Sequence, residues 1–395
     1  MSKPIHNPSP PSPATGFTLI ELMLAMTLSL LVLGVAFTLV QQLANTADLM
    51  GSTSDVNENL RAAVNMVSRD FSTAGANIPL GGIPAPYGGT ATSINEPYPA
   101  GQKFPTPAAG NTLFIPVITA GNALGPTQGN GANAFTTDVV TIMGVNQTSL
   151  FNPTAVSGNP TVSAAAATIT VSPIANASYV QAGQLIMLTN SNSSCLLTVS
   201  SVNTTTGVIT FKNGDANDVL GVNQFSILST GAVAFAVTSG PTSGTISFLQ
   251  SASTNNGVTT YSWPAITAYP ISMVTYYLDT STPRRLMKLV TVGSASQAQP
   301  VALGIYVMTL QYSLSPPGTL NGAVSDPVRN PWPTVADPTN SPNDIRKAVL
   351  TMIAEADHQN HGSGKWYSRS ITNSVTVQNL DYYNKYRLGA NMTTN

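Results

Sequence analysis

The stretch that decides the fold is Gly16-Phe17-Thr18-Leu19-Ile20-Glu21-Leu22-Met23-Leu24-Ala25-Met26, which opens an apolar run that continues to Val40. Glu21 is the only charged residue between Phe17 and Val40. A lone carboxylate inside a membrane-length apolar helix is costly unless something pairs with it. Glu21 is therefore a candidate functional residue.

The run from Phe17 to Val40 is long enough to cross a membrane. As an α-helix its 24 residues would extend about 36 Å, against about 30 Å for the hydrocarbon core of a bilayer. Leu, Met and Ala, which favour helices, dominate the run, and proline is absent from it. We predict a transmembrane helix over residues 17–40.

The residues before the run do not form an ordinary secretory signal. Met1 to Gly16 contains a single Lys, Lys3, and five prolines. A secretory signal places a small-residue cleavage site after its apolar segment, whereas the small residue Gly16 comes before it here. Cleavage after Gly16 would leave the apolar helix on the mature chain, starting at Phe17.

The segment Gly-Phe-Thr-Leu-Ile-Glu-Leu from Gly16 to Leu22 resembles the prepilin motif of type IV pilins and of type II secretion pseudopilins. The resemblance implies cleavage between Gly16 and Phe17 by a prepilin peptidase and N-methylation of the Phe17 amine. It also implies that Glu21 pairs with the N-terminal amine of a neighbouring subunit, and a buried carboxylate does need a cationic partner. The alternative is a signal anchor in which Glu21 occurs by chance.

The composition limits the function of the whole chain. Charged residues make up 8% of it, against about 25% in ordinary soluble domains. The net charge of −1 provides no basic field, so no nucleic-acid partner is predicted. A single cysteine, Cys195, excludes an intramolecular disulfide, and we expect it to be buried and inert.

The helix is predicted to continue beyond the apolar run, to residue 72. Apolar residues recur there every three or four positions, at Val56, Leu60, Val64, Val67 and Phe71. This spacing is typical of an amphipathic helix that docks one face on a sheet. Asp55 and Glu58 have capping-box spacing, so Gly51-Ser52-Thr53 is a candidate interruption of the helix.

The remainder indicates a β-rich domain. After the leader (1–16) and the helix (17–72) we expect a Pro/Gly-rich loop region at 73–112, where proline opposes regular pairing. A β-rich globular domain follows at 113–395, with a possible inserted β-subdomain at 155–253. Short segments rich in Val, Ile and Thr between Gly, Asn and Ser indicate its strands. The candidate strands are 113–118, 138–143, 168–171, 184–188, 195–200, 207–211, 224–228, 232–237, 245–248, 273–278, 285–292, 301–314, 348–353 and 370–377.

The expected fold class is therefore α+β, with a long N-terminal membrane helix packed on an antiparallel β-rich C-terminal domain. The final third of the chain resembles PilW-type minor pilins, which are themselves similar to J-type minor pseudopilins. The segments that carry this resemblance are Tyr276-Tyr277-Leu278-Asp279, residues 300–305 leading into Leu310-Gln311-Tyr312, and Ile345-Arg346-Lys347-Ala348-Val349.

No pattern of catalytic residues is visible, so we predict a protein that is not an enzyme and that uses no metal or cofactor. His358 and His361, with Glu355 and Asp357 nearby, could offer metal ligands, but surface histidines on a loop explain them better. Asp215 and Asp218 lack the spacing of a full calcium loop. The basic residues Arg284, Arg285 and Lys288 are explained better by a solvated turn than by DNA capture.

The function favoured by the sequence is that of a minor, PilW-like type IV pilin that helps to initiate pilus assembly at or near the tip. Its expected partners are the prepilin peptidase and other major and minor pilins. Its expected location is the inner membrane, with the C-terminal domain in the periplasm, and the pilus after assembly. The alternatives are a minor pseudopilin of type II secretion and a membrane-anchored adhesin whose β-domain binds a ligand through Tyr261, Trp263 and Tyr269.

Overall fold

The computed structural model describes residues 16–79, 82–85, 94–104, 113–128, 134–146, 151–162, 166–190, 194–223, 251–256, 258–292, 296–314, 324–325, 345–359, 364 and 366–377. The leader up to residue 15 and the strands predicted at 224–228, 232–237 and 245–248 lie outside these residues. The chain divides into two compact units, residues 1–54 with 358–367 and residues 55–357 with 368–395.

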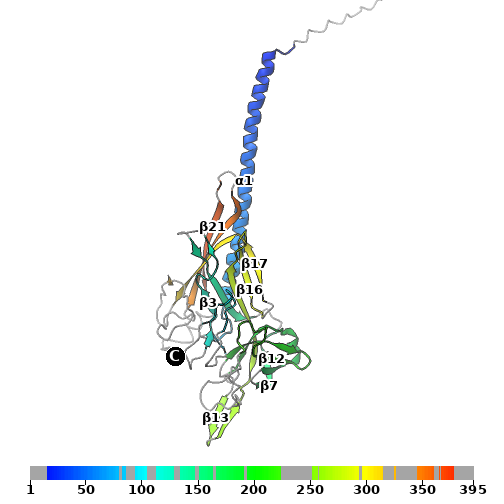
Figure 1. Ribbon diagram of the computed structural model, residues 1–395, viewed down its shortest axis with the longest axis vertical. Helices are drawn as coiled ribbons and strands as arrows, with labels where there is room; N and C mark the ends of the chain where they lie inside the picture. The colour runs from blue at the N-terminus through cyan, green and yellow to red at the C-terminus, as the bar shows by residue number, and fades with distance from the viewer. Residues whose placement is uncertain are drawn as a thin grey trace, which may run out of the picture. The chain divides into compact units, whose positions relative to one another are not determined.

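Helix α1 is continuous from Leu19 to Thr73 (Figure 1). The interruption predicted at Gly51-Ser52-Thr53 is therefore wrong. The Thr53 hydroxyl donates to the Leu49 carbonyl at 2.7 Å, so this side chain is satisfied inside the helix and does not compete with it. The helix ends just before Gly75, whose φ of 73° is a conformation that glycine adopts without strain.

The C-terminal part of α1 packs on the β-rich domain through a single face. The buried residues of the helix are Val56, Leu60, Ala63, Val64, Val67 and Phe71. They include every member of the predicted apolar stripe, and that prediction is confirmed. Because the stripe repeats every three or four residues, it lies along one side of the helix and leaves the other side to solvent.

The strands follow α1 in the order of the chain. The first are β1 (Ile83–Ala85), β2 (Leu113–Ile115), β3 (Ile118–Gly121), β4 (Thr127–Gln128), β5 (Phe135–Thr136), β6 (Val139–Val145), β7 (Thr154–Val162), β8 (Ala166–Ser172), β9 (Leu185–Thr189), β10 (Ser194–Thr198), β11 (Ser201–Asn203) and β12 (Val208–Lys212). The last are β13 (Ser251–Asn255), β14 (Val258–Ser262), β15 (Thr267–Leu278), β16 (Arg285–Val290), β17 (Gln297–Leu303), β18 (Ile305–Leu314), β19 (Val324–Ser325), β20 (Ile345–Gln359) and β21 (Trp366–Thr376).

Strand β15 joins the parts of the largest sheet. Among the described residues this sheet has eleven strands, with the path β10-β9-β15-β7-β8-β12-β11 and with β6, β3, β16 and β17 attached through β15. The first part of β15 pairs with β9 and β7, and its second part pairs with β6 and β16. A second sheet has the order β19-β18-β20-β21. The pairings are antiparallel, and the α+β fold class is confirmed.

Two predicted strands are broken in the structure. The strand predicted at 113–118 is divided into β2 and β3 around Pro116, which has no N–H to donate to a ladder. The strand predicted at 301–314 is divided into β17 and β18 at Gly304, whose φ is 70°. The predicted strands include none at β1, β4, β5, β7, β11, β13, β14 or β19. In the longest of these, β7, Gly, Ser, Asn and Thr dilute the apolar pattern.

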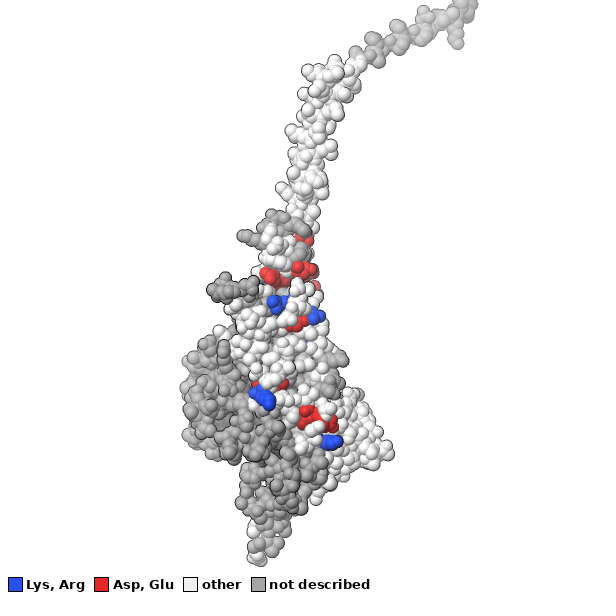
Figure 2. Space-filling view, viewed as in Figure 1, with Lys and Arg blue, Asp and Glu red and all other residues white. Residues whose placement is uncertain are grey.

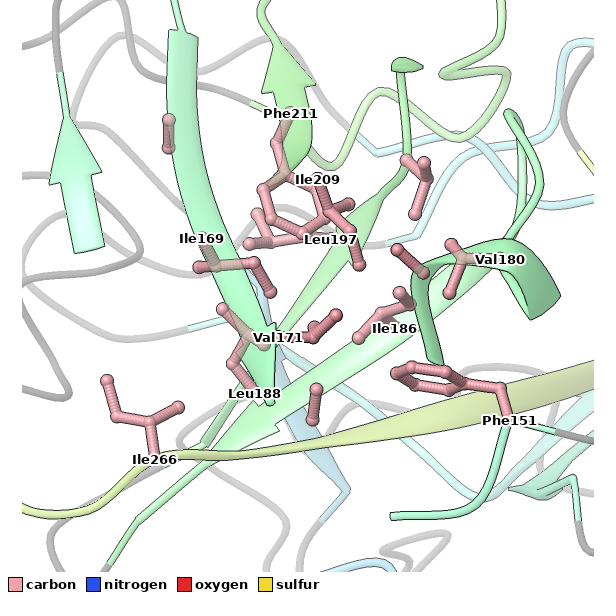
Figure 3. Close-up of a cluster of buried hydrophobic side chains, with 14 of the residues drawn as sticks. Phe151, Ile169, Val171, Val180, Ile186, Leu188, Leu197, Ile209, Phe211 and Ile266 are labelled. Carbon is pink, nitrogen blue, oxygen red and sulfur yellow. The ribbon is translucent and has the colours of Figure 1, made fainter. Parts of the chain in front are cut away.

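A compact hydrophobic cluster lies among β8, β9, β10 and β12 (Figure 3). Its members include Phe151, Ile169, Ile209 and Phe211, each at most 2% exposed. Cys195 belongs to it and is buried, and burial raises the pKa of its thiol, so it stays protonated and unreactive. Strands β7 to β12 follow one another between β6 and β15, which supports the proposal of an inserted β-subdomain at 155–253.

The described part of the Pro/Gly-rich region contributes to a second hydrophobic cluster. Ile83, Ile94 and Phe104 are at most 1% exposed and pack with Met143 and Met273 among others. Strand β1 pairs with β2, although Pro84 lies in its centre. The region is therefore more than a surface loop over these residues: its apolar side chains cover one side of the sheet.

Candidate functional site

The start of α1 is a capping box formed by Thr18 and Glu21. The Glu21 N–H donates to the Thr18 hydroxyl at 3.4 Å, and the Thr18 N–H donates to Glu21 Oε2 at 3.0 Å. The Thr18 hydroxyl is also 3.0 Å from Glu21 Oε2. This reciprocal arrangement satisfies N–H groups that the first turn of a helix leaves without partners. It explains why α1 begins at Leu19 and not at Phe17.

One oxygen of Glu21 remains available. Oε2 accepts both bonds from Thr18, whereas Oε1 has no partner in the part of the chain that the structure describes. Gly16 and Phe17 precede the helix, and the Phe17 side chain is 89% exposed. The three residues singled out in the sequence therefore lie within six positions of each other at one helix end, where a carboxylate oxygen can accept a further cationic donor.

The apolar part of α1 is uncovered. Every residue from Phe17 to Val40 is exposed, and the face shown in Figure 2 carries no charged side chain along it. By length and composition α1 could cross a membrane. So large an apolar surface is not stable in water and needs lipid or other helices around it. Membrane anchoring by this helix is in accord with the sequence prediction.

The C-terminal part of α1 is tied to the sheet by polar contacts that the sequence did not indicate. Asp70 Oδ2 lies 2.8 Å from Lys288 Nζ and accepts the Tyr276 hydroxyl at 2.5 Å. Asn373 Nδ2 donates to the Ser68 hydroxyl at 2.9 Å. The only signal in the sequence was a charged residue, Asp70, immediately beside the buried stripe.

The basic group on the β15–β16 hairpin is used inside the domain. Arg285 Nη2 lies 2.6 Å from Asp279 Oδ2, and the Arg284 guanidinium lies 5.7 Å from the centre of the Tyr306 ring. Lys288 is the partner of Asp70 described above. Each of these cations thus has an anion or an aromatic ring beside it within the domain, while the Arg285 side chain is still 40% exposed at the turn.

The acidic loop after β12 has a structural role. Asp218 Oδ1 accepts the Thr198 hydroxyl and the Val222 N–H, and Oδ2 accepts the Asn223 N–H. Burial raises the pKa of Asp218 in spite of these bonds. Asp215 accepts the Asn217 N–H. Both carboxylates thus serve local turns.

No group of three or more His, Cys, Asp or Glu residues in the described part of the chain could hold a metal ion. Of the histidines considered as ligands, His358 belongs to β20 and His361 lies outside the described residues. Glu355 is half-buried in β20, and burial raises the pKa of its carboxyl.

Two of the candidate ligand-binding aromatics, Trp263 and Tyr269, pack on different hydrophobic clusters. Trp263 packs on the cluster that contains Phe211, and Tyr269 packs on the cluster that contains Phe104. Tyr261 belongs to β14. Core packing accounts for Trp263 and Tyr269, and no observation on these residues favours a glycan site.

The start of α1 falls within a sequence motif that is shared with known proteins. Residues 12–37 match the family model of the prokaryotic N-terminal methylation motif. No match was found among curated proteins or among solved structures. Gly16, Phe17 and Glu21 all lie within the matched residues, and the motif supports a type IV pilin-like or pseudopilin subunit.

Proposed function

We propose that this chain is a minor type IV pilin of the PilW-like kind, which helps to initiate pilus assembly and sits at or near the tip. The observation that carries the proposal is the combination of a methylation motif with a fully exposed apolar helix that begins at the motif. Such a chain serves as a building block of a filament and not as an enzyme.

In this proposal the prepilin peptidase cuts between Gly16 and Phe17, and the new Phe17 amine is methylated. The apolar part of α1 holds the subunit in the inner membrane, with the β-rich domain in the periplasm. On assembly this helix leaves the lipid and packs with the helices of other pilins. Glu21 Oε1, which has no partner in the described chain, accepts the N-terminal ammonium of a neighbour.

The size of the folded domain supports a position at the tip. The second unit comprises residues 55–357 and 368–395, and a domain this large is awkward to repeat along a thin fibre. The segments that resemble PilW-type pilins fall largely on the strands β15, β17, β18 and β20. Immunogold labelling restricted to the ends of isolated pili is expected, and even labelling along them would contradict the proposed position.

The decisive experiment is the intact mass and N-terminal sequence of the protein from cells with and without prepilin peptidase. A chain that starts at methylated Phe17 only when the peptidase is present is expected. A chain that retains Gly16, or one cut after Val40, would overturn the proposal.

A minor pseudopilin of type II secretion is the second candidate, because both groups share the matched motif. Deleting the gene separates the two functions. Loss of pili with normal secretion supports the minor pilin, whereas loss of secretion with normal pili supports the pseudopilin.

A further inference from the structure

Three side chains from distant parts of the sequence form a small aromatic and cationic cluster on the β-rich domain. Phe135 of β5 lies edge-on to Tyr306 of β18, with the ring centroids 6.2 Å apart. The Arg284 guanidinium lies 5.7 Å from the centre of the same Tyr306 ring. Phe135 is 37% exposed, and the other two residues are half-buried. We name Phe135, Arg284 and Tyr306 the Arg284 patch.

The backbone beneath the patch is fixed by the corner between β17 and β18. The Gly304 N–H donates to the Arg284 carbonyl at 2.7 Å, and the Glu355 N–H donates to the Gly304 carbonyl at 2.8 Å. Tyr306 follows two positions later in β18, which pairs along its length with β20. A surface that is held in this way needs little reorganisation to bind a partner, so little of the binding free energy is spent on ordering it.

Within the described chain, the Arg284 guanidinium has no anionic partner. It contacts the Tyr306 ring, whereas the next residue, Arg285, pairs with Asp279. A guanidinium carries five N–H donors and binds a carboxylate through two of them at once. Lys and Arg together number only 15 in 395 residues, and residues 139–211 contain no charged residue. Arg284 is therefore one of few places where electrostatics can select a partner for this domain.

The residue types of the patch are those that carry binding energy at protein–protein interfaces. Tyr and Arg are enriched among the residues whose truncation weakens binding most, and Phe is enriched at interfaces relative to the rest of the surface. An aromatic side chain that is exposed beside a cation without an anion has a reason to be covered by a partner that supplies both an apolar group and a carboxylate.

The position of the patch shows which side of the domain it serves. The Gly75 N–H, at the end of α1, donates to the Met143 carbonyl, opposite a β15 residue three positions before Tyr276. Asp70, earlier in α1, contacts Tyr276 itself. Strand β15 therefore runs back along α1, and the turn that leads to Arg284 lies on the side from which the helix enters the domain. A subunit at a filament tip meets the subunits beneath it on this side.

We propose that the Arg284 patch binds the folded domain of a different pilin-like subunit, which presents an aspartate or glutamate beside an apolar side chain. The inference rests on the proposed function, because a tip subunit whose large domain is not repeated meets other pilins and not copies of itself. Phe135 and Tyr306 contact the apolar side chain, and the Arg284 guanidinium donates to the carboxylate. A partner without the carboxylate would bury Arg284 without an anion, so the ion pair selects the partner.

The test is photocrosslinking in cells that produce the full chain and the other components of the filament. A benzophenone amino acid replaces Phe135, and in a matched control it replaces Val290, which is also 37% exposed but ends β16. We expect an adduct from position 135 and none from position 290. Peptide mass spectrometry should place it in the folded domain of another pilin-like subunit, beside an Asp or Glu. Equal adducts from both positions, or an adduct with a second copy of this chain only, would overturn the proposal.

Charge reversal tests the role of Arg284. Arg284→Glu is expected to reduce the adduct from position 135 by roughly fivefold or more. Lys347→Glu, at an exposed site on β20, makes the same change in net charge and should leave the adduct unchanged. Replacing the acidic residue of the partner with Arg should restore the adduct to the Arg284→Glu chain. An unchanged adduct in Arg284→Glu, or no recovery with the exchanged pair, would contradict the proposal.

The two proposals fail in different ways. If position 135 gives no adduct while the subunit is still cleaved after Gly16 and found in filaments, the Arg284 patch is not the interface and the proposed function stands. If the subunit is neither cleaved nor incorporated, the proposed function itself fails.

Discussion

Lys288 Nζ lies 2.8 Å from Asp70 Oδ2, although 218 positions separate the two residues in the chain. Both side chains are largely buried, at 20% and 17% exposure. The Tyr276 hydroxyl donates to the same oxygen, and the Lys288 ammonium lies 5.5 Å from the centre of the Tyr276 ring. The last turn of α1 is thereby fixed against β15 and β16 by one shared acceptor.

Replacing Asp70 with Asn should destabilise the folded domain by about 2 kcal/mol, because a charged acceptor of two largely buried donors is lost. Thermal unfolding of the purified full chain in detergent measures the change. Glu58→Gln, which removes an exposed carboxylate from the same helix, should change stability by less than about 0.5 kcal/mol. A double-mutant cycle that combines Asp70→Asn with Lys288→Met should give a nonzero coupling energy. If the two losses of stability simply add, the two residues are not coupled.

Gly304→Ala should destabilise the domain through two effects, the strain of a positive φ and a steric clash of the new Cβ atom. A Cβ atom at Gly304 would lie 2.7 Å from the Glu355 carbonyl oxygen, and φ is 70°. Gly158 has the same φ of 70° but open space around its Cβ position, so Gly158→Ala measures the strain, about 1 to 2 kcal/mol. Equal losses of stability in the two variants would show that β18 and β20 separate without cost.

The stability of the domain should fall as the pH rises from about 4.5 to 7 through Glu96. Burial raises the pKa of Glu96 from its ordinary 4.5 to about 7, so the folded state favours the protonated carboxyl. The contribution of protonated Glu96 to the stability of the folded state is fully present below pH 4.5, the pKa of Glu96 in the unfolded chain. It is lost as the pH rises to about 7, the pKa of Glu96 in the folded domain.

Glu96→Gln should therefore raise the unfolding temperature at pH 8 relative to the parent chain, by an amount that corresponds to about 3 kcal/mol, and have little effect at pH 4. Unfolding curves across this range measure the difference. Glu58→Gln controls for the loss of one negative charge. A constant difference between Glu96→Gln and the parent at all pH values would refute the assignment.

Glu21→Ala should abolish incorporation into filaments without preventing membrane insertion, because the apolar surface of α1 is unchanged while the carboxylate is lost. Thr18→Val removes the capping hydroxyl but keeps the carboxylate, so it should weaken the helix start by about 1 kcal/mol and retain assembly. Immunoblots of sheared filaments and of membranes measure both properties. Normal incorporation of Glu21→Ala would remove the carboxylate from the assembly mechanism.

The sequence predicted what depends on near neighbours in the chain. Phe17 to Val40 is recognisable from composition, and the stripe through Leu60 and Phe71 from its period. The contact of Asp70 with Lys288 was not predictable, since nothing local marks two distant residues as partners. The division of β17 from β18 depends on the positive φ of Gly304, which composition does not reveal.

The candidate site was found in the sequence as three residues, but the role of Thr18 was missed. The spacing of Thr18 and Glu21 is that of a capping box, and it could have been read from the sequence alone.

The capping box also bears on what proteolysis does to the helix. If the chain is cut after Gly16 as proposed, the neutral amide of Phe17 becomes an ammonium group at the positive pole of the α1 macrodipole, which amounts to about half an elementary charge. Methylation of the amine keeps this charge. The Glu21 carboxylate, one turn along, can then accept from its own ammonium group or from that of a neighbour. Cleavage would thus place a positive charge beside the positive end of the helix dipole in an isolated subunit, which is unfavourable. Association with a second subunit, whose carboxylate can pair with this ammonium group, would offset the repulsion that cleavage introduced.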